Sequence, residues 1–114
     1  MSALPKKTNI LTLRAQKRKK IKTVLVTAYD IWQAKLADEA GVDAILVGDS
    51  LGMTTLGHET TIPVTMEDMI RHTKAVRRGT TRAFLIGDMP YLSYQVSNEE
   101  AIRNAGKFVQ SGVD

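Results

Sequence analysis

Short apolar runs alternate with helical patterns along most of the sequence, and this alternation constrains the fold more than any other feature. The runs at 24–28, 44–47 and 83–86 are compact and rich in β-branched or large apolar residues. Such continuous runs are typical of strands buried on both faces. A helical pattern of apolar residues follows each run. Three strand–helix units in succession predict an α/β protein with a parallel sheet covered by helices.

Boundary residues mark where the predicted helices begin and end. The helix that begins at Ile31 is expected to end at Gly41, because glycine adopts the left-handed conformation common after a last helical turn. Thr65–Asp68 and Ser97–Glu100 both have the spacing of a capping box and predict two further helix starts. The stretch 51–65 is polar and punctuated by Gly and Pro, so it predicts a long loop of the kind that is often functional.

Basic side chains are concentrated at the N-terminus. Residues 1–22 carry eight Lys or Arg and no acidic residue, whereas the rest of the chain carries eight basic and twelve acidic residues. Such a cluster suits either a nucleic-acid contact or a solvated helix face. It contains no aromatic residue for base stacking, so we expect a solvated helix that docks through Leu11, Leu13 and Ile21. The predicted organisation is a basic leader at 1–22 and an α/β body at 23–114.

Composition excludes several classes of protein. The sequence has no Cys, which removes disulfides, thiolate metal sites and cysteine nucleophiles. No run of 18 apolar residues suggests a membrane-spanning helix, and no apolar segment of a secretory signal follows the basic N-terminus. We therefore expect a cytoplasmic protein.

Two of the three predicted strands end in Gly-Asp. The carboxyl ends of parallel strands open on one face of a sheet, so Asp49 and Asp88 are expected to share one rim. Two carboxylates in one space repel each other unless a cation lies between them. With no Cys and two His in the chain, Mg²⁺ suits this pair better than Zn²⁺. The alternative is that each aspartate only shapes a turn or caps a helix, and spacing alone leaves both open.

Other polar residues are predicted at the same rim. The hydroxyl and backbone N–H of Ser50 suit a substrate carboxylate, or they only shape a turn. Tyr29 and Asp30 end the first strand, and Asp30 equally suits the N-cap of the next helix. His58 lies in the long loop, where it suits a ligand contact, whereas His72 lies on a predicted helix and is expected to be structural.

Several segments closely resemble the ketopantoate hydroxymethyltransferase family. Val26–Asp30, Val47–Met53 and Gly57–Thr65 carry the resemblance, and His72–Gly79 and Asp88–Tyr91 keep the same order. The resemblance covers about residues 10–114. It implies a (β/α)₈ TIM barrel of the phosphoenolpyruvate/pyruvate type, of which this chain supplies the first three units.

The resemblance also implies an activity in pantothenate biosynthesis. The family transfers a hydroxymethyl group from 5,10-methylenetetrahydrofolate to 3-methyl-2-oxobutanoate, giving 2-dehydropantoate through a Mg²⁺-stabilised enolate. By motif match, Asp49 and Asp88 would bind the metal and contact substrate, and Ser50 would bind substrate. The enzyme is expected to be a homo-oligomer with no membrane or nucleic-acid partner.

Other family residues are expected after position 114. The resemblance places a substrate-contacting lysine and a third acidic residue on the next strand, and the general base further on. We therefore expect no catalytic base within this chain and no turnover from the chain alone. Two alternatives stay open: a related Mg²⁺-dependent keto-acid lyase or mutase on the same barrel, and a non-enzymatic fragment with a basic leader.

Overall fold

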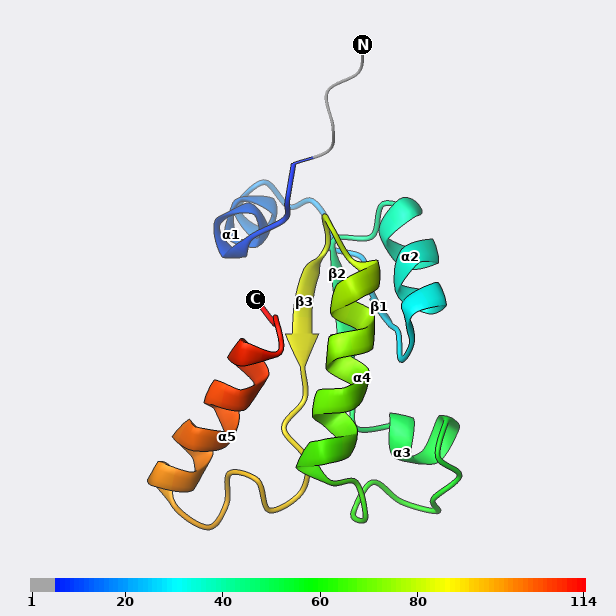
Figure 1. The fold of residues 1–114 in the computed structure, drawn as a ribbon. Helices are drawn as coiled ribbons and strands as arrows, with labels where there is room; N and C mark the ends of the chain where they lie inside the picture. Colours follow the sequence, from blue (N-terminus) through cyan, green and yellow to red (C-terminus); the bar gives the residue numbers. More distant parts are fainter. Residues whose placement is uncertain (1–5) are drawn as a thin grey trace.

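The computed structural model describes residues 6–114, which form a parallel sheet and its flanking helices (Figure 1). The first five residues of the predicted leader lie outside the described residues. In chain order the elements are α1 (Ile10–Arg18), β1 (Leu25–Thr27), α2 (Ile31–Glu39), β2 (Ala44–Val47), α3 (Leu51–Thr54), α4 (Met66–Gly79), β3 (Phe84–Gly87) and α5 (Asn98–Gln110). The three predicted strands and the three long helices that follow them are all present.

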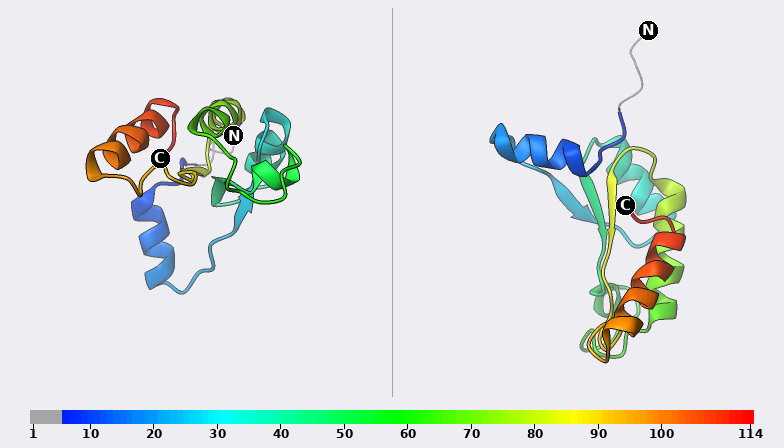
Figure 2. Two further views of the ribbon diagram at one scale, coloured as in Figure 1. Left: turned by 90° about the horizontal axis from the view of Figure 1, so that it is seen from below. Right: turned by 90° about the vertical axis from the view of Figure 1, so that its left-hand side faces the viewer.

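The strands form one parallel sheet in the order β1-β2-β3, so each strand lies beside its neighbour in the sequence. Ile45 in β2 is paired with Val26 on one side and with Leu85 on the other. Helices α2, α4 and α5 lie on one face of this sheet, and α1 lies on the opposite side (Figure 2). This arrangement confirms the predicted α/β class.

The core lies between the sheet and its helical layer. Ile45 and Leu85 from the strands are fully buried, as are Met69 and Val76 from α4. Met69 and Val76 lie seven positions apart, two helical turns, so α4 presents one apolar face to the sheet. Phe108 of α5 is also buried and extends the same core past β3.

Polar caps fix where the helices begin. The capping box of α4 is complete, because the Thr65 hydroxyl accepts from the Asp68 N–H and the Asp68 carboxylate accepts from the Thr65 N–H. The box predicted for α5 forms only in one direction: the Ser97 hydroxyl accepts from the Glu100 N–H at 3.1 Å. At the other end of a helix, Gly41 has φ +89° and ends α2 as predicted.

The predicted loop at 51–65 contains a short helix, so that prediction was wrong for residues 51–54. Leu51 is fully buried, and its packing against the core fixes the first turn after the Gly48–Ser50 segment. The Thr54 N–H donates to the Ser50 carbonyl at 3.0 Å and closes the turn. The apolar anchor was visible in the sequence, but the surrounding glycine and threonine residues favoured a loop.

The expected apolar docking of the N-terminal helix was also wrong. Leu11 and Ile21 are 66% and 54% exposed, and Leu13 is half-buried. A polar contact attaches α1 instead, because the Gln16 amide donates to the Asp43 carboxylate at 3.0 Å. The basic face predicted for this segment is indeed exposed to solvent.

The residues before α1 cross the start of β3. The Thr8 N–H donates to the Arg82 carbonyl at 2.8 Å, and the Lys7 ammonium donates to the Ala83 carbonyl at 2.8 Å. Lys7 also pairs with Asp114 at 2.5 Å, which joins two residues 107 positions apart. Burial tends to raise the pKa of Asp114, but the hydrogen bond from Lys7 and other contacts outweigh this effect and lower the pKa.

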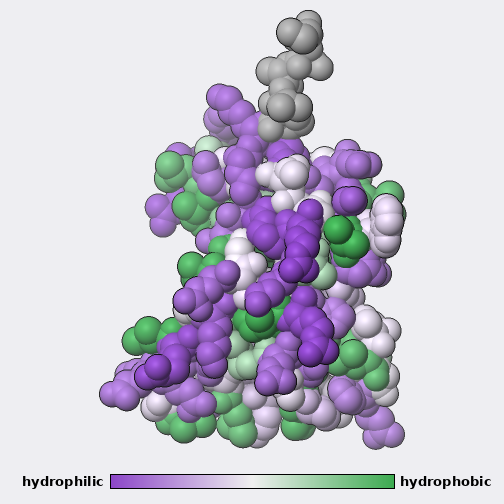
Figure 3. Space-filling model, in the orientation of Figure 1, coloured by the Kyte–Doolittle hydropathy of each residue, from purple (hydrophilic) through white to green (hydrophobic). Residues whose placement is uncertain are grey.

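The surface that carries α4 and α5 is mostly hydrophilic. Apolar side chains gather along its lower edge, where the loops between α3 and α4 and between β3 and α5 lie (Figure 3). Ile62, Tyr91, Leu92 and Val96 in these loops are at least half exposed. No helix within residues 6–114 is long and apolar enough to cross a membrane.

A carboxylate on α2 holds the start of β3. The Asp38 side chain accepts from the backbone N–H groups of Thr81, Arg82 and Ala83 and from the Thr81 hydroxyl, at 2.8–3.1 Å for the closest contacts. Burial tends to raise the pKa of Asp38, but these hydrogen bonds outweigh it and lower the pKa below its ordinary value. Asp38 therefore links a helix to the strand edge as a charged acceptor.

Replacing Asp38 should destabilise the chain. We expect Asp38→Ala to lower the free energy of unfolding at pH 7 by about 1–3 kcal/mol, since two part-buried N–H groups and the Thr81 N–H lose a charged acceptor. Because the folded pKa is lowered, the stabilisation is complete above pH about 4 and is lost as the pH falls through the folded pKa. Urea denaturation from pH 7 to pH 2 measures both effects. The neighbouring exposed Glu39→Ala serves as control, and equal losses in the two variants would contradict the role of Asp38.

Candidate active site

The register of the sheet brings the two predicted aspartates together. Val47, the last residue of β2, is paired with Gly87, the last residue of β3. The Asp88 N–H then donates to the Val47 carbonyl at 3.0 Å, which continues the pairing one residue past β3. The Asp49 N–H donates to the Asp88 carboxylate at 3.2 Å. The two residues therefore share the carboxyl-end rim of the sheet.

The negative charge of Asp88 disfavours the ionised form of Asp49. Burial raises the pKa of Asp49, and the negative charge of Asp88 raises it further, while the Thr61 hydroxyl has a smaller opposing effect. A bound cation would reverse the repulsion between the carboxylates. No cluster of three or more His, Cys, Asp or Glu residues suited to a metal occurs within residues 6–114. The described part of the chain therefore offers two carboxylate ligands at most at this place.

Ser50 lies next to the carboxylate pair, and its hydroxyl does not serve the local helix. It occupies the N-cap position of α3, yet its side chain makes no capping hydrogen bond there. Its Oγ instead lies 2.6 Å from the hydroxyl oxygen of Tyr29. The backbone of Ser50 does take part in the local turn, because its carbonyl accepts from the Met53 N–H at 2.9 Å.

The backbone of Tyr29 is held by two helices. The residue is 9% exposed, and its backbone N–H donates to the Gln33 side chain at 2.8 Å. Its carbonyl lies 2.6 Å from His72 Nδ1. The expectation that His72 is structural agrees with this contact, because the ring links α4 to the end of β1.

The remaining candidates at the rim have local roles. Asp30 accepts from the Gln33 N–H at 2.8 Å and caps α2, which is the alternative considered for it above. The His58 backbone N–H donates to the Gly52 carbonyl at 2.8 Å, and the ligand contact expected of its ring stays a prediction. Sequence reasoning singled out neither Thr61 nor the Tyr29–Ser50 contact, because both depend on how separate segments meet in space.

Gly48 keeps the centre of the rim open. A Cβ atom at this position would lie 3.4 Å from both the Asp88 carboxylate and the Ser50 hydroxyl. A longer side chain would therefore enter the space that these two groups face. Glycine at the strand end leaves that space available to a ligand.

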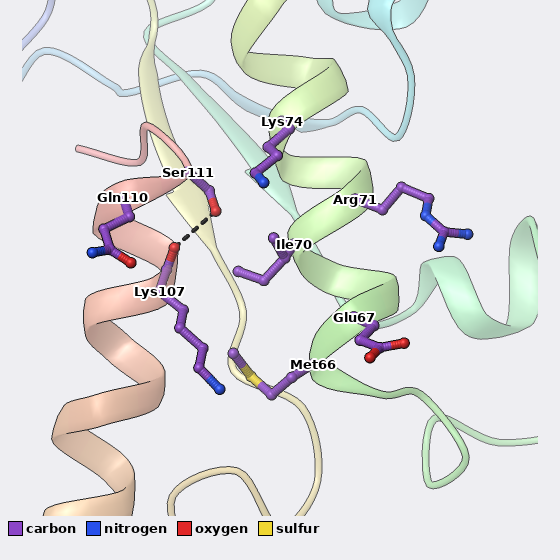
Figure 4. A pocket seen from close by; sticks show the side chains of 8 residues that line it. All are labelled: Met66, Glu67, Ile70, Arg71, Lys74, Lys107, Gln110 and Ser111. Atoms are coloured by element: carbon purple, nitrogen blue, oxygen red, sulfur yellow. Dashed lines mark hydrogen bonds between the residues drawn. The ribbon is translucent and has the colours of Figure 1, made fainter.

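A well-formed cavity of the described residues lies elsewhere. It has a volume of about 630 Å³ and separates α4 from α5 (Figure 4). Ile70 and Lys74 from α4 and Lys107 from α5 point into the space between the helices, whereas Arg71 points away from it. Neither Asp49 nor Asp88 lines this cavity, so the carboxylate rim and the helical groove are separate features.

The fold is similar to that of solved enzyme structures. One match is a crystal structure of oxaloacetate acetylhydrolase, with a TM-score of 0.69 and 18% identity, covering 96% of this chain and 39% of that one. Another is 2,3-dimethylmalate lyase, described as a PEP mutase/isocitrate lyase superfamily member, with a TM-score of 0.64 and 18% identity, covering 90% and 36%. These matches define the chain as part of an α/β barrel of that fold class.

The sequence relationships then identify the family. A family model described as ketopantoate hydroxymethyltransferase matches residues 7–114, and the chain belongs to that family. The chain is 53% identical over 109 residues to the 3-methyl-2-oxobutanoate hydroxymethyltransferase of Thermoanaerobacter sp. (strain X514), covering 96% of this chain and 40% of the relative. It is 63% identical over 87 residues to that of Geobacillus sp. (strain WCH70), covering 76% and 31%. The chain thus spans about two fifths of the length of such relatives or less.

A close contact fixes the helix that carries Ser50. A Cβ atom at Gly52 would lie 2.2 Å from the Val64 Cγ2 atom, so α3 and the segment before α4 fit together only without that atom. We expect Gly52→Ala to lower the free energy of unfolding by about 1–3 kcal/mol through overpacking. Chemical denaturation measures this loss.

The matched compensation is the double variant Gly52→Ala/Val64→Ala, which removes the clashing methyl group. We expect it to be more stable than a simple sum of the two single substitutions, because the added atom then occupies vacated space. Purely additive losses would contradict the contact.

Proposed function

We propose that residues 23–114 form the first three units of a hydroxymethyltransferase barrel and bind its keto acid at the carboxylate rim. The reaction would transfer a one-carbon unit from 5,10-methylenetetrahydrofolate to 3-methyl-2-oxobutanoate and give 2-dehydropantoate. The observation that carries the proposal is the meeting of Asp49 and Asp88. The family membership supports the substrate assignment.

The donor set at the rim suits Mg²⁺. Carboxylate oxygens are hard ligands, and Mg²⁺ is commonly bound by one or two carboxylates while substrate and water fill its other positions. The raised pKa of Asp49, caused by burial and by the charge of Asp88, fits a pair that a divalent cation would stabilise. We therefore assign Asp49 and Asp88 as the metal ligands of this chain.

Each residue at the rim then has a part in binding substrate. A bound Mg²⁺ would polarise the 2-oxo group and stabilise negative charge as the C3 proton leaves. Asp49 and Asp88 would orient the keto acid through the cation. The Ser50 hydroxyl would donate to the substrate carboxylate, and Gly48 would leave room for it.

The reaction also needs groups that we assign outside these three units. The proposed general base, a lysine that contacts substrate and a third acidic residue belong to later units of the barrel. We therefore propose that the chain alone binds keto acid without turning it over. For the whole enzyme we propose a homo-oligomer in the cytoplasm.

A keto-acid lyase on the same barrel is the second candidate. Its support is the similarity to a lyase and a hydrolase structure, and that similarity extends to the fold alone because the identities are 18%. The family match favours the hydroxymethyltransferase. Dependence of turnover on the folate donor separates the two reactions.

The metal assignment is tested by neutralising each carboxylate. We expect Asp49→Asn and Asp88→Asn each to abolish Mg²⁺-dependent binding of 3-methyl-2-oxobutanoate to the chain, measured by calorimetry. In a chimera that joins residues 1–114 to the remaining part of the Thermoanaerobacter relative, we expect each to lower folate-dependent turnover by about 100- to 1000-fold. Loss of several kcal/mol of charge stabilisation corresponds to that range.

Asp30→Asn is the matched control. It removes one negative charge from the same rim, and asparagine still caps a helix N-terminus. We expect this variant to keep both binding and turnover. Near-normal turnover by Asp88→Asn, or equal losses in all three variants, would overturn the assignment.

A further inference from the structure

We infer that Tyr29 is a positioning residue that fixes the orientation of the Ser50 hydroxyl toward the substrate carboxylate. The inference rests on the proposed function, in which Ser50 binds the keto acid. It adds a residue from the segment between β1 and α2 to a site otherwise built from the ends of β2 and β3. All three strands of the sheet would then contribute to substrate binding.

The first argument is that the backbone of Tyr29 is held at both its N–H and its carbonyl and that the residue is buried. Its backbone N–H donates to the Gln33 side chain, its carbonyl contacts His72 Nδ1, and the residue is 9% exposed. Gln33 belongs to α2 and His72 to α4, so two helices fix the position of one residue. A group held in this way can orient a neighbour without losing much conformational entropy.

The second argument is that the Ser50 hydroxyl has no competing local partner in its own helix. Serine at an N-cap usually accepts from a backbone N–H two or three residues later, and Ser50 does not. Its Oγ atom faces Tyr29 at 2.6 Å. A Cβ atom at Gly48 would also lie 3.4 Å from this Oγ, so the hydroxyl borders the open centre of the rim.

The chemistry of a carboxylate then sets the direction of the bonds. A carboxylate only accepts hydrogen bonds, so Ser50 must use its single proton to donate to the substrate. The Tyr29 hydroxyl must therefore donate to the Ser50 oxygen. Donation from a phenol polarises the serine hydroxyl and strengthens the bond that it donates onward.

A purely structural tyrosine makes a different prediction. If Tyr29 only fills space, Tyr29→Phe keeps the ring, its packing and both backbone bonds, and leaves Ser50 unchanged. If Tyr29 positions Ser50, the same substitution frees the serine rotamer. Three-bond couplings in NMR report the Ser50 side-chain rotamer directly, without any ligand.

The experiment compares the isotope-labelled, unaltered chain with three variants: Tyr29→Phe, Ser50→Ala and Tyr29→Phe/Ser50→Ala. We expect one Ser50 rotamer in the unaltered chain and averaged couplings in Tyr29→Phe. Titration with 3-methyl-2-oxobutanoate and Mg²⁺, followed at the Gly48 amide, should show about three- to tenfold weaker binding in Tyr29→Phe, as expected for one lost hydrogen bond. In the Ser50→Ala background, Tyr29→Phe should have no further effect.

Tyr94→Phe is the matched control, because it removes the same hydroxyl from a ring that is half exposed. Unchanged Ser50 couplings in Tyr29→Phe, or an equal loss of affinity with and without the serine hydroxyl, would overturn the inference. A Ser50→Ala variant with unaltered keto-acid affinity would count against the proposed function instead. The couplings would still decide whether Tyr29 orients Ser50, so the two failures are distinguishable.

Discussion

The pairing of Val47 with Gly87 is the constraint on which the site depends. Parallel pairing fixes register along the whole strand, and a slip of one residue would move Asp88 to the other face of the sheet. Because the last residues of β2 and β3 are paired, Asp49 and Asp88 lie side by side just after the strands end. The hydrogen bond from Asp49 to the Asp88 carboxylate is a consequence of that register.

The same geometry places two negative charges where burial is partial. Folding brings them together although they repel, and the packing of Ile45, Val47 and Leu85 behind them supplies the stability that tolerates this repulsion. Such local strain at the rim of a well-packed sheet is characteristic of sites built for a ligand. The apolar strands therefore stabilise the fold, and the polar side chains at their ends stay available for chemistry.

Periodicity and boundary residues allowed the strands, the long helices and the meeting of the aspartates to be predicted from sequence. The predictions failed where a tertiary contact decided the outcome. Leu51 is buried and makes a helical turn out of a Gly- and Thr-rich segment, and Gln16 attaches a helix that was expected to dock through leucine. The contact between Tyr29 and Ser50 joins positions 21 residues apart, and no local pattern marks it.

All residues assigned to the rim come from three consecutive strand–helix units. Tyr29 follows β1, Asp49 and Ser50 follow β2, and Asp88 follows β3. Genetic recombination between barrel genes that keeps this stretch intact would therefore transmit these four rim residues together. Descendants could acquire new chemistry by exchanging the later units while inheriting the same arrangement of polar groups at the strand ends.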